Sequence, residues 1–168
     1  MKFKTFITFL FAGLMSFVPF AASAGAATWA VHNLSAKDGK FQFTVTSISC
    51  GTKTYSSPDG FSSDTAQGVY CRIGLTVKNI GKKSQMLDES AQTLNSYSGT
   101  QYSPDTSADI DLNSNGMWEL KSLNPGLQLS GYLFFDVPKG TRIASLSVHD
   151  SAFSGGATLN LKSVGAHS

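Results

Sequence analysis

The feature that most constrains the fold is an apolar alternation within residues 68–79. Its apolar members are Val69, Cys71, Ile73, Leu75 and Val77. Polar or small residues separate them, and every second side chain of a β-strand lies on one face of its sheet. The stretch therefore predicts a half-buried β-strand, which ends where Gly81 and two lysines mark a turn.

Strands are expected on both sides of this one. Residues 28–34 favour an edge strand, and residues 127–137 favour a long strand with large apolar side chains on one face. Along residues 40–50 the apolar phase shifts by one position after Val45, so we expect a β-bulge near Thr46-Ser47. Shorter strands are expected at residues 85–87, 91–97, 101–102, 143–149 and 158–164.

The segments between these strands are rich in turn-forming residues. Residues 51–67 contain Ser57-Pro58-Asp59-Gly60 and many serines, and they predict a long surface loop. Residues 103–118 predict a loop with one helical turn, and no amphipathic helix is expected in residues 25–168. Strands that recur between turns indicate an all-β fold. We expect an immunoglobulin-like antiparallel β-sandwich of about seven to eight strands.

The first residues have the composition of a secretory signal peptide. Two lysines precede an apolar stretch at residues 6–18, and Ala22-Ser23-Ala24 provides the small residues that a signal peptidase recognises. We therefore predict a signal peptide at residues 1–24 and a single domain at residues 25–168. A second cleavage pattern begins at Ala24, which leaves the cut open by about two residues.

Export without a lipid anchor is expected, because the first cysteine is Cys50, far beyond the predicted cleavage site. We therefore expect a secreted or periplasmic protein with no stable membrane anchor after cleavage. Cleavage removes Lys2 and Lys4 from the 13 basic side chains, which leaves as many basic as acidic side chains, 11 of each. A net charge of zero offers no basic surface for nucleic acid, and we expect a monomer with no nucleic-acid partner.

The two cysteines, Cys50 and Cys71, stand at the end of one predicted strand and near the start of the next. In an exported protein such a pair predicts a disulfide. The alternative, a reactive thiol or a metal pair, lacks a Cys-x-x-Cys spacing and a nearby histidine. Closing a loop of about 20 residues stabilises a domain by roughly 3 kcal/mol.

Five motifs in a fixed order resemble a known family. They are Cys50-Gly51, residues 68–83, residues 101–105, Leu123-Asn124-Pro125-Gly126 and residues 131–140. Their order resembles that of uncharacterised exported bacterial proteins with a telokin-like, immunoglobulin-like β-sandwich domain, relatives of a small mycobacterial secreted antigen. The resemblance covers residues 41–162 and implies the sandwich and a paired Cys50 and Cys71, but no catalytic or ligand residues. Many members look like lipoproteins, whereas this chain lacks the lipid-receiving cysteine.

No catalytic motif is evident in the sequence. The three histidines are His32, His149 and His167. No Gly-x-Ser-x-Gly turn accompanies His149-Asp150. Asp88 and Glu89 are adjacent and would point different ways on a strand, so they do not provide the facing carboxylates of a glycosidase. We therefore expect a non-enzyme, and an exported hydrolase is the third hypothesis for function.

One segment resembles the first half of a calcium loop. Its oxygen-bearing side chains are Asp109, Asp111, Asn113 and Asn115, followed by Gly116. Hard cations favour several oxygens brought together by a tight turn. The twelfth position, however, is Ser122, where a calcium loop has a bidentate glutamate. A solvated loop without metal is therefore expected, and no other cofactor is indicated. A calcium-stabilised structural domain of the cell envelope is the second hypothesis.

The predicted strand at residues 127–137 carries large apolar side chains on both faces. Tyr132 and Phe134 have the parity opposite to Leu133 and Phe135. Either a neighbouring loop covers Tyr132 and Phe134, or they form an exposed patch for a partner. The leading hypothesis is an exported, non-enzymatic binding or interaction module, whose partner is an unknown protein or cell-envelope ligand.

Overall fold

The central alternation forms the middle of strand β3 (Ser63–Asn79) in the computed structural model, which describes residues 27–113 and 121–168. The predicted signal peptide lies outside these residues. β3 pairs with β2 (Phe41–Ser56) on one side and with β6 (Gln128–Val137) on the other. β1 (Ala27–Asp38) pairs with β2, so the first sheet has the order β1-β2-β3-β6 and the predicted edge strand lies at its edge.

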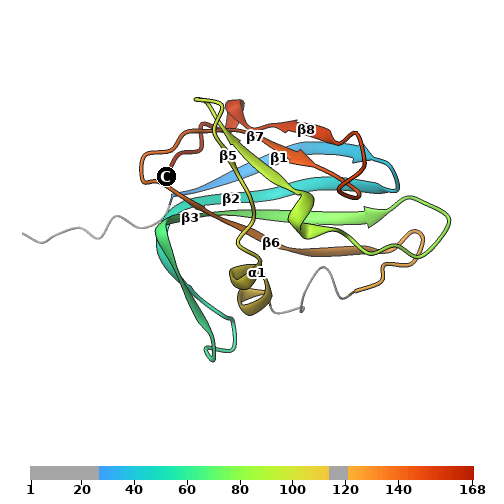
Figure 1. Ribbon diagram of the computed structural model, residues 1–168, viewed down its shortest axis with the longest axis horizontal. Helices are drawn as coiled ribbons and strands as arrows, with labels where there is room; N and C mark the ends of the chain where they lie inside the picture. The colour runs from blue at the N-terminus through green and yellow to red at the C-terminus, as the bar shows by residue number, and fades with distance from the viewer. Residues whose placement is uncertain (1–26, 114–120) are drawn as a thin grey trace, which may run out of the picture.

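The second sheet has the order β5-β4-β7-β8 and stacks on the first (Figure 1). Its strands are β4 (Thr93–Ser96), β5 (Gln101–Tyr102), β7 (Ile143–Val148) and β8 (Ala157–Asn160). All pairings within both sheets are antiparallel. The predicted antiparallel β-sandwich is therefore confirmed. In the described part of the chain it has eight strands, joined by the short helices η1 (Glu89–Ala91), α1 (Thr106–Leu112) and η3 (Lys162–Val164).

The space between the sheets holds one large apolar cluster, called here the inner core. Its largest members are Phe41, Phe43, Ile48, Ile73, Leu75, Leu94, Leu133, Phe135, Ile143 and Leu146, all no more than 1% exposed. The alternating residues of β3 all point into it, as their period of two requires. A core of this kind is stabilised mainly by the removal of apolar surface from water.

The β-bulge in β2 is confirmed. Val45 pairs with Leu75 and Ser47 pairs with Gly74, so Thr46 is the extra residue of the longer strand. The bulge restores the inward direction of Ile48, which is fully buried. Gly74 is required opposite it, because a Cβ at this position would collide with the hydroxyl groups of Thr46 and Ser47.

The predicted long loop at residues 51–67 is wrong for most of its length. β2 and β3 continue past the cysteines as a hairpin, called here the arm (residues 52–68), which projects from the sandwich next to α1 (Figure 1). Thr54 pairs with Thr65 and Tyr55 with Asp64. The apolar alternation that reveals a half-buried strand is missing here because most of these side chains face solvent.

Smaller differences occur in the other short segments. Only an isolated bridge between Gln85 and Leu123 forms in the expected strand 85–87. Residues 91–97 divide between η1 and β4, and β8 ends at Asn160 before η3 begins. The helical turn expected within residues 103–118 is present as α1, whose seven residues make about two turns. No helix in the described ranges is long and apolar enough to cross a membrane.

Candidate functional site

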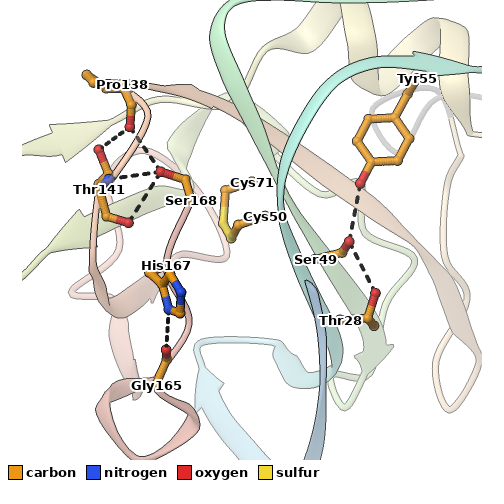
Figure 2. The surroundings of a disulfide bond; sticks show 10 residues. All are labelled: Thr28, Ser49, Cys50, Tyr55, Cys71, Pro138, Thr141, Gly165, His167 and Ser168. Carbon is orange, nitrogen blue, oxygen red and sulfur yellow. Dashed lines mark hydrogen bonds between the residues drawn. A yellow bond between two sulfur atoms is a disulfide. The ribbon is translucent and has the colours of Figure 1, made fainter. Parts of the chain in front are cut away.

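The disulfide between Cys50 and Cys71 lies where the arm leaves the sandwich. The two cysteines are direct partners in the register of β2 and β3, with their Cα atoms 4.0 Å apart. Figure 2 shows two polar clusters on either side of the bond. On one side Ser49 Oγ lies 3.4 Å from the hydroxyl of Tyr55 in the arm. The disulfide therefore joins the inner core to the base of the arm.

On the other side of the disulfide, the last residue of the chain is tied to the turn between β6 and β7 (Figure 2). Ser168 Oγ accepts a hydrogen bond from Thr141 N at 2.9 Å and donates to Pro138 O at 3.0 Å. Ser168 N donates to Thr141 O at 3.0 Å. These contacts stabilise the sandwich, and they provide no group for chemistry.

Helix α1 covers the free edge of β6 with its side chains. Asp109 Oδ1 accepts a hydrogen bond from Phe134 N at 2.6 Å. Asn113 uses its whole amide, because Oδ1 accepts from Tyr132 N at 2.7 Å and Nδ2 donates to Tyr132 O at 2.9 Å. The main chain of Asp105 donates to Phe134 O at 2.7 Å. An edge strand otherwise exposes such groups to pairing with another chain, so α1 replaces a fifth strand over this part of β6.

Beneath α1 lies a second apolar cluster, on the face of the first sheet that points away from the inner core. This outer cluster consists of Ala66, Tyr70, Ala108, Leu112 and Phe134, with Tyr55 packed against it. The rings of Tyr70 and Phe134 meet edge to face at 5.7 Å between centroids, and those of Tyr55 and Phe134 at 5.3 Å. Such aromatic geometry contributes about 0.5–1.5 kcal/mol per pair beyond the area that is buried.

Asp105 fixes the start of α1 to the outer cluster. Its Oδ1 accepts from Ala108 N at 3.3 Å as the helix N-cap, and its Oδ2 accepts from the hydroxyl of Tyr70 at 3.0 Å. Partial burial raises the pKa of Asp105, but hydrogen bonds from Ser107, Ala108 N and Tyr70 outweigh it and hold this pKa below its ordinary value. Burial and the Asp105 carboxylate raise the pKa of the Tyr70 hydroxyl, which therefore stays protonated and donates.

A pair of acidic side chains is buried beside the same helix. Asp109 is fully buried and Glu89, in η1, is 1% exposed. The carboxyl group of Glu89 lies within hydrogen-bonding reach of that of Asp109. Burial, followed by the proximity of Glu89, raises the pKa of Asp109 to about 10. Two negative charges are therefore disfavoured in this buried pair.

The residues predicted as a calcium loop do not converge on one point. Asp109 and Asn113 turn toward β6, whereas Asp111 is exposed on another side of α1. Asn115 lies outside the described residues. No group of three or more histidine, cysteine, aspartate or glutamate side chains is placed to hold a metal ion in the described ranges. Helical geometry separates these residues, because positions two apart on a helix do not share a face.

The candidate partner patch of Tyr132 and Phe134 is divided by α1 and the arm. Phe134 is only 1% exposed and belongs to the outer cluster, so it is not part of an exposed patch. Tyr132 keeps 37% of its surface exposed. The guanidinium of Arg72 lies between two rings, 4.4 Å from the centroid of Tyr132 and 4.8 Å from that of Tyr55. Tyr132 is therefore the exposed end of a tyrosine–arginine–tyrosine stack whose other two members, Arg72 and Tyr55, are half-buried.

A hollow of about 540 Å³ separates the tip of the arm from α1. It is lined by Ser57, Pro58, Asp59, Ser62, Ile110, Asp111 and Asn113. Asp59 shapes the tip, because its Oδ1 accepts from Ser57 Oγ at 2.5 Å and from Phe61 N at 3.0 Å. Phe61 is 92% exposed at this tip. Most residues that line the hollow are polar, and one of them, Asn113, also binds the main chain of Tyr132.

The histidines do not form a catalytic arrangement with the serine beside them. His149 Nδ1 lies 3.3 Å from Ser154 Oγ, and this hydroxyl donates to Ser151 O at 3.0 Å. In a hydrolase triad the histidine takes the proton of the serine hydroxyl, whereas here a main-chain carbonyl holds it. The ring of His167 packs on Trp29, with 5.4 Å between centroids. The side chain of His32 is not among those the structure describes.

Sequence reasoning missed Arg72 and the roles of Glu89 and Asp105. A signal for the helix face was present, because Asp105, Asp109 and Asn113 are spaced by four residues and four is the repeat of one helix face. Arg72 lies on the polar parity of the central alternation, where its neighbours across the sheet decide its environment. Glu89 gave no signal, since its burial depends on the packing of η1.

The sequence matches the model of the family described as Domain of unknown function (DUF4352) over residues 32–158. This match covers most of the chain. The chain belongs to the DUF4352 family. Among curated proteins, the DUF4352 chain has no match.

Solved structures confirm the sandwich of this DUF4352 protein. It is similar to a conserved hypothetical protein from Bacillus anthracis, with a TM-score of 0.57 and 14% identity over 83% of this chain and 100% of that one. A functionally unknown protein from Listeria monocytogenes gives 0.51 and 13% over 82% of this chain and 88% of that one. The secreted protein MPT63 from Mycobacterium tuberculosis gives 0.50 and 17% over 71% and 82%. At these identities the likeness shows the fold alone.

Proposed function

We propose that this protein is an exported, non-enzymatic binding module that binds a carboxylate-bearing segment of a partner protein through Arg72 and Tyr132. Export is supported by the composition of residues 1–24, which is that of a secretory signal peptide. Phe134, which the sequence suggested as part of a partner patch, is buried and cannot contact a partner. Arg72 takes its place beside Tyr132 in the proposed binding surface.

The observation that carries this proposal is the state of the Arg72 guanidinium. It is held between the rings of Tyr55 and Tyr132, and its Nε, which is buried, has no hydrogen-bond partner among the described residues. A guanidinium has five donors in one plane, and two of them match the two oxygens of a carboxylate. Arg72 therefore offers donors that this chain leaves unused.

The stack is also preorganised for binding. The side-chain amide of Asn113 binds both the N–H and the C=O of Tyr132. The hydroxyl of Tyr55 lies 3.4 Å from Ser49 Oγ. The two rings thus restrict the arginine side chain before a partner arrives. Less conformational entropy is then lost on binding, which strengthens an interaction with few contacts.

The test is a titration of the isotopically labelled domain with an N-acetylated tetraglutamate peptide, followed by NMR. We expect saturable shifts of the Arg72 side-chain resonance and of the amides around Tyr132, and none with the matching tetralysine peptide. Arg72→Gln should remove these shifts, while the amide resonances in the rest of the domain keep the positions that they have in the folded, unaltered protein. Arg72→Lys should weaken them, because an ammonium group keeps the charge and loses the planar pair of donors.

Arg142 provides the matched control, since its guanidinium lies 4.5 Å from the centroid of the Tyr97 ring on the other sheet. This arginine is exposed and stacks on one ring. Arg142→Gln should leave the glutamate titration unchanged. Shifts that are equal for both peptides, or that survive in Arg72→Gln, would contradict the proposal.

A further inference from the structure

The inference concerns the acidic pair beneath α1, which the proposed binding role does not use. Asp109 and Glu89 belong to segments twenty residues apart and meet where water is excluded, since both are at most 1% exposed. Asp109 Oδ1 is occupied by Phe134 N at 2.6 Å. Asp109 Oδ2 receives no hydrogen bond from an N–H or hydroxyl group of a described residue. The contact between the two carboxyl groups therefore requires a proton.

The charges around this pair favour the same conclusion. The groups that act on Asp109 are the carboxyls of Glu89 in η1 and Asp105 at the start of α1, and both are acidic. From β6 the contact is the main-chain N–H of Phe134. From β3 the hydroxyl of Tyr70 is engaged by Asp105, and Arg72, the register partner of Phe134, has its guanidinium stacked between Tyr55 and Tyr132. Two negative charges in such a site would repel each other and lose their hydration.

We propose that Asp109 and Glu89 form a proton-binding latch, in which one shared proton holds α1 on the edge of β6. With the proton present, the pair is a carboxyl–carboxylate hydrogen bond and Asp109 keeps its contact with Phe134 N. Without it, the repelling pair separates, α1 leaves β6, and the edge groups of Tyr132 and Phe134 become exposed. The latch thus makes the availability of this strand edge depend on pH.

The direction of the pH dependence follows from linkage. The docked state binds a proton that the open state, with ordinary carboxyl pKa values near 4, releases. Docking is therefore strongest at low pH and weakens as pH rises. Between pH 5 and 8 the difference is one proton, so the equilibrium constant for opening of α1 rises about tenfold per pH unit. This direction is opposite to that of a carboxylate held by an ion pair.

Amide hydrogen exchange of the full-length mature domain tests the latch. The reporters are the amides of Tyr132 and Phe134, whose hydrogen bonds end on α1. After correction for the intrinsic exchange rates, we expect their opening constant to rise about tenfold per pH unit between pH 5 and 8. An opening constant that does not change with pH would overturn the proposal.

Asp109→Asn tests the role of the proton separately from that of packing, because asparagine has nearly the same size as aspartate and does not titrate. The amide keeps an acceptor for Phe134 N and offers its own N–H to the Glu89 carboxylate, so the contact no longer needs a proton. The pH dependence should disappear, with strong protection retained at pH 8. Asp111→Asn is the matched control on the exposed side of the same helix and should keep the full dependence.

Glu89→Gln gives a second variant, in which the amide donates to Asp109, and it should also remove the pH dependence. If the Asp109 variant does not fold, the pH dependence of the opening constant in the unaltered protein and in Glu89→Gln still tests the latch. A dependence that persists in both variants would contradict the latch. So would recovery of protection at pH 8 on addition of calcium, because a cation and not a proton would then join the carboxylates.

Discussion

The inner core and the outer cluster lie on opposite faces of the same sheet and are built in different ways. The inner core is apolar and continuous between two sheets. The outer cluster has five buried members and is closed by α1 and the arm, with Asp105, Asp109 and Asn113 providing its polar contacts. Two adjacent residues of β6 show the contrast, because Phe135 points into the inner core and Phe134 into the outer cluster.

The two faces of β6 therefore differ in stability, because the outer cluster can open locally while the inner core unfolds only with the whole sandwich. Burial of apolar area stabilises the inner core at any pH, since no titratable group takes part. The outer cluster combines burial with hydrogen bonds from carboxyl groups, whose protonation changes with pH. A small cluster under a seven-residue helix can open locally while the sandwich stays folded. The binding surface proposed above is therefore attached to the less stable side of the sheet.

The largest effect is expected from Phe135→Ala. Phe135 is fully buried among inner-core residues, and its truncation leaves a cavity that two packed sheets cannot close. The free energy of global unfolding should fall by about 3–5 kcal/mol. Urea denaturation followed by fluorescence and circular dichroism measures this change, and both signals should shift together. A loss of less than 1 kcal/mol would show that the inner core is more plastic than its burial indicates.

Loss of the disulfide comes next. The double change Cys50→Ser and Cys71→Ser should lower the free energy of unfolding by about 2–5 kcal/mol, because the chain between them gains freedom when unfolded. Thermal unfolding of the double variant measures it, and the protein in reductant provides an independent comparison. The bond joins the two regions at the base of the arm. If it serves the arm alone, the inner core will keep its full stability without it.

Phe134→Ala should have a smaller global effect, in the range of about 1–3 kcal/mol, although Phe134 is as large and nearly as buried as its neighbour. The outer cluster can open locally, so its loss is felt mainly by α1 and the arm. Hydrogen exchange should show faster exchange at Tyr132 and in α1, with unchanged protection in β3. Equal global effects of Phe134→Ala and Phe135→Ala would remove the distinction between the two regions.

Asp105→Ala should destabilise the docked helix by about 1 kcal/mol, because the N-cap acceptor of α1 is lost. The pKa of Asp105 is lowered in the folded protein, so its contribution is present above the ordinary carboxyl pKa. This contribution is lost as pH falls through the lowered pKa, at pH values below about 4. Exchange of the α1 amides at pH 6 and at pH 3 measures both effects. A variant that matches the unaltered protein at pH 6 would contradict the capping role.

The smallest effect is expected from calcium. Asp109 and Asn113 are engaged by β6, so melting curves with several millimolar calcium and with chelator should coincide. Asp111→Ala should change neither curve, since this side chain is exposed and makes no described contact. A rise of several degrees that Asp111→Ala abolishes would show that these oxygens do bind an ion, and the outer cluster would then depend on a cation.

The sequence alone predicted the sandwich, the bulge in β2 and the cysteine pair. Each of these has a local cause: a period of two marks the buried face, a phase shift marks the bulge, and two cysteines in an exported chain mark a disulfide. The arm was missed because its strands bury little, and pattern reading depends on a contrast between buried and exposed positions.

Only the tertiary structure decided what the polar residues do. Asp109 and Asn113 could serve a calcium loop or a helix face, and the edge of β6, some twenty residues later in the chain, selected the helix face. Glu89 meets Asp109 only because η1 and α1 pack at the same place, and Arg72 is enclosed only because Tyr55 and Tyr132 come from strands on either side of it. Contacts between distant segments have no period in the sequence, so their chemistry appears only when the chain has folded.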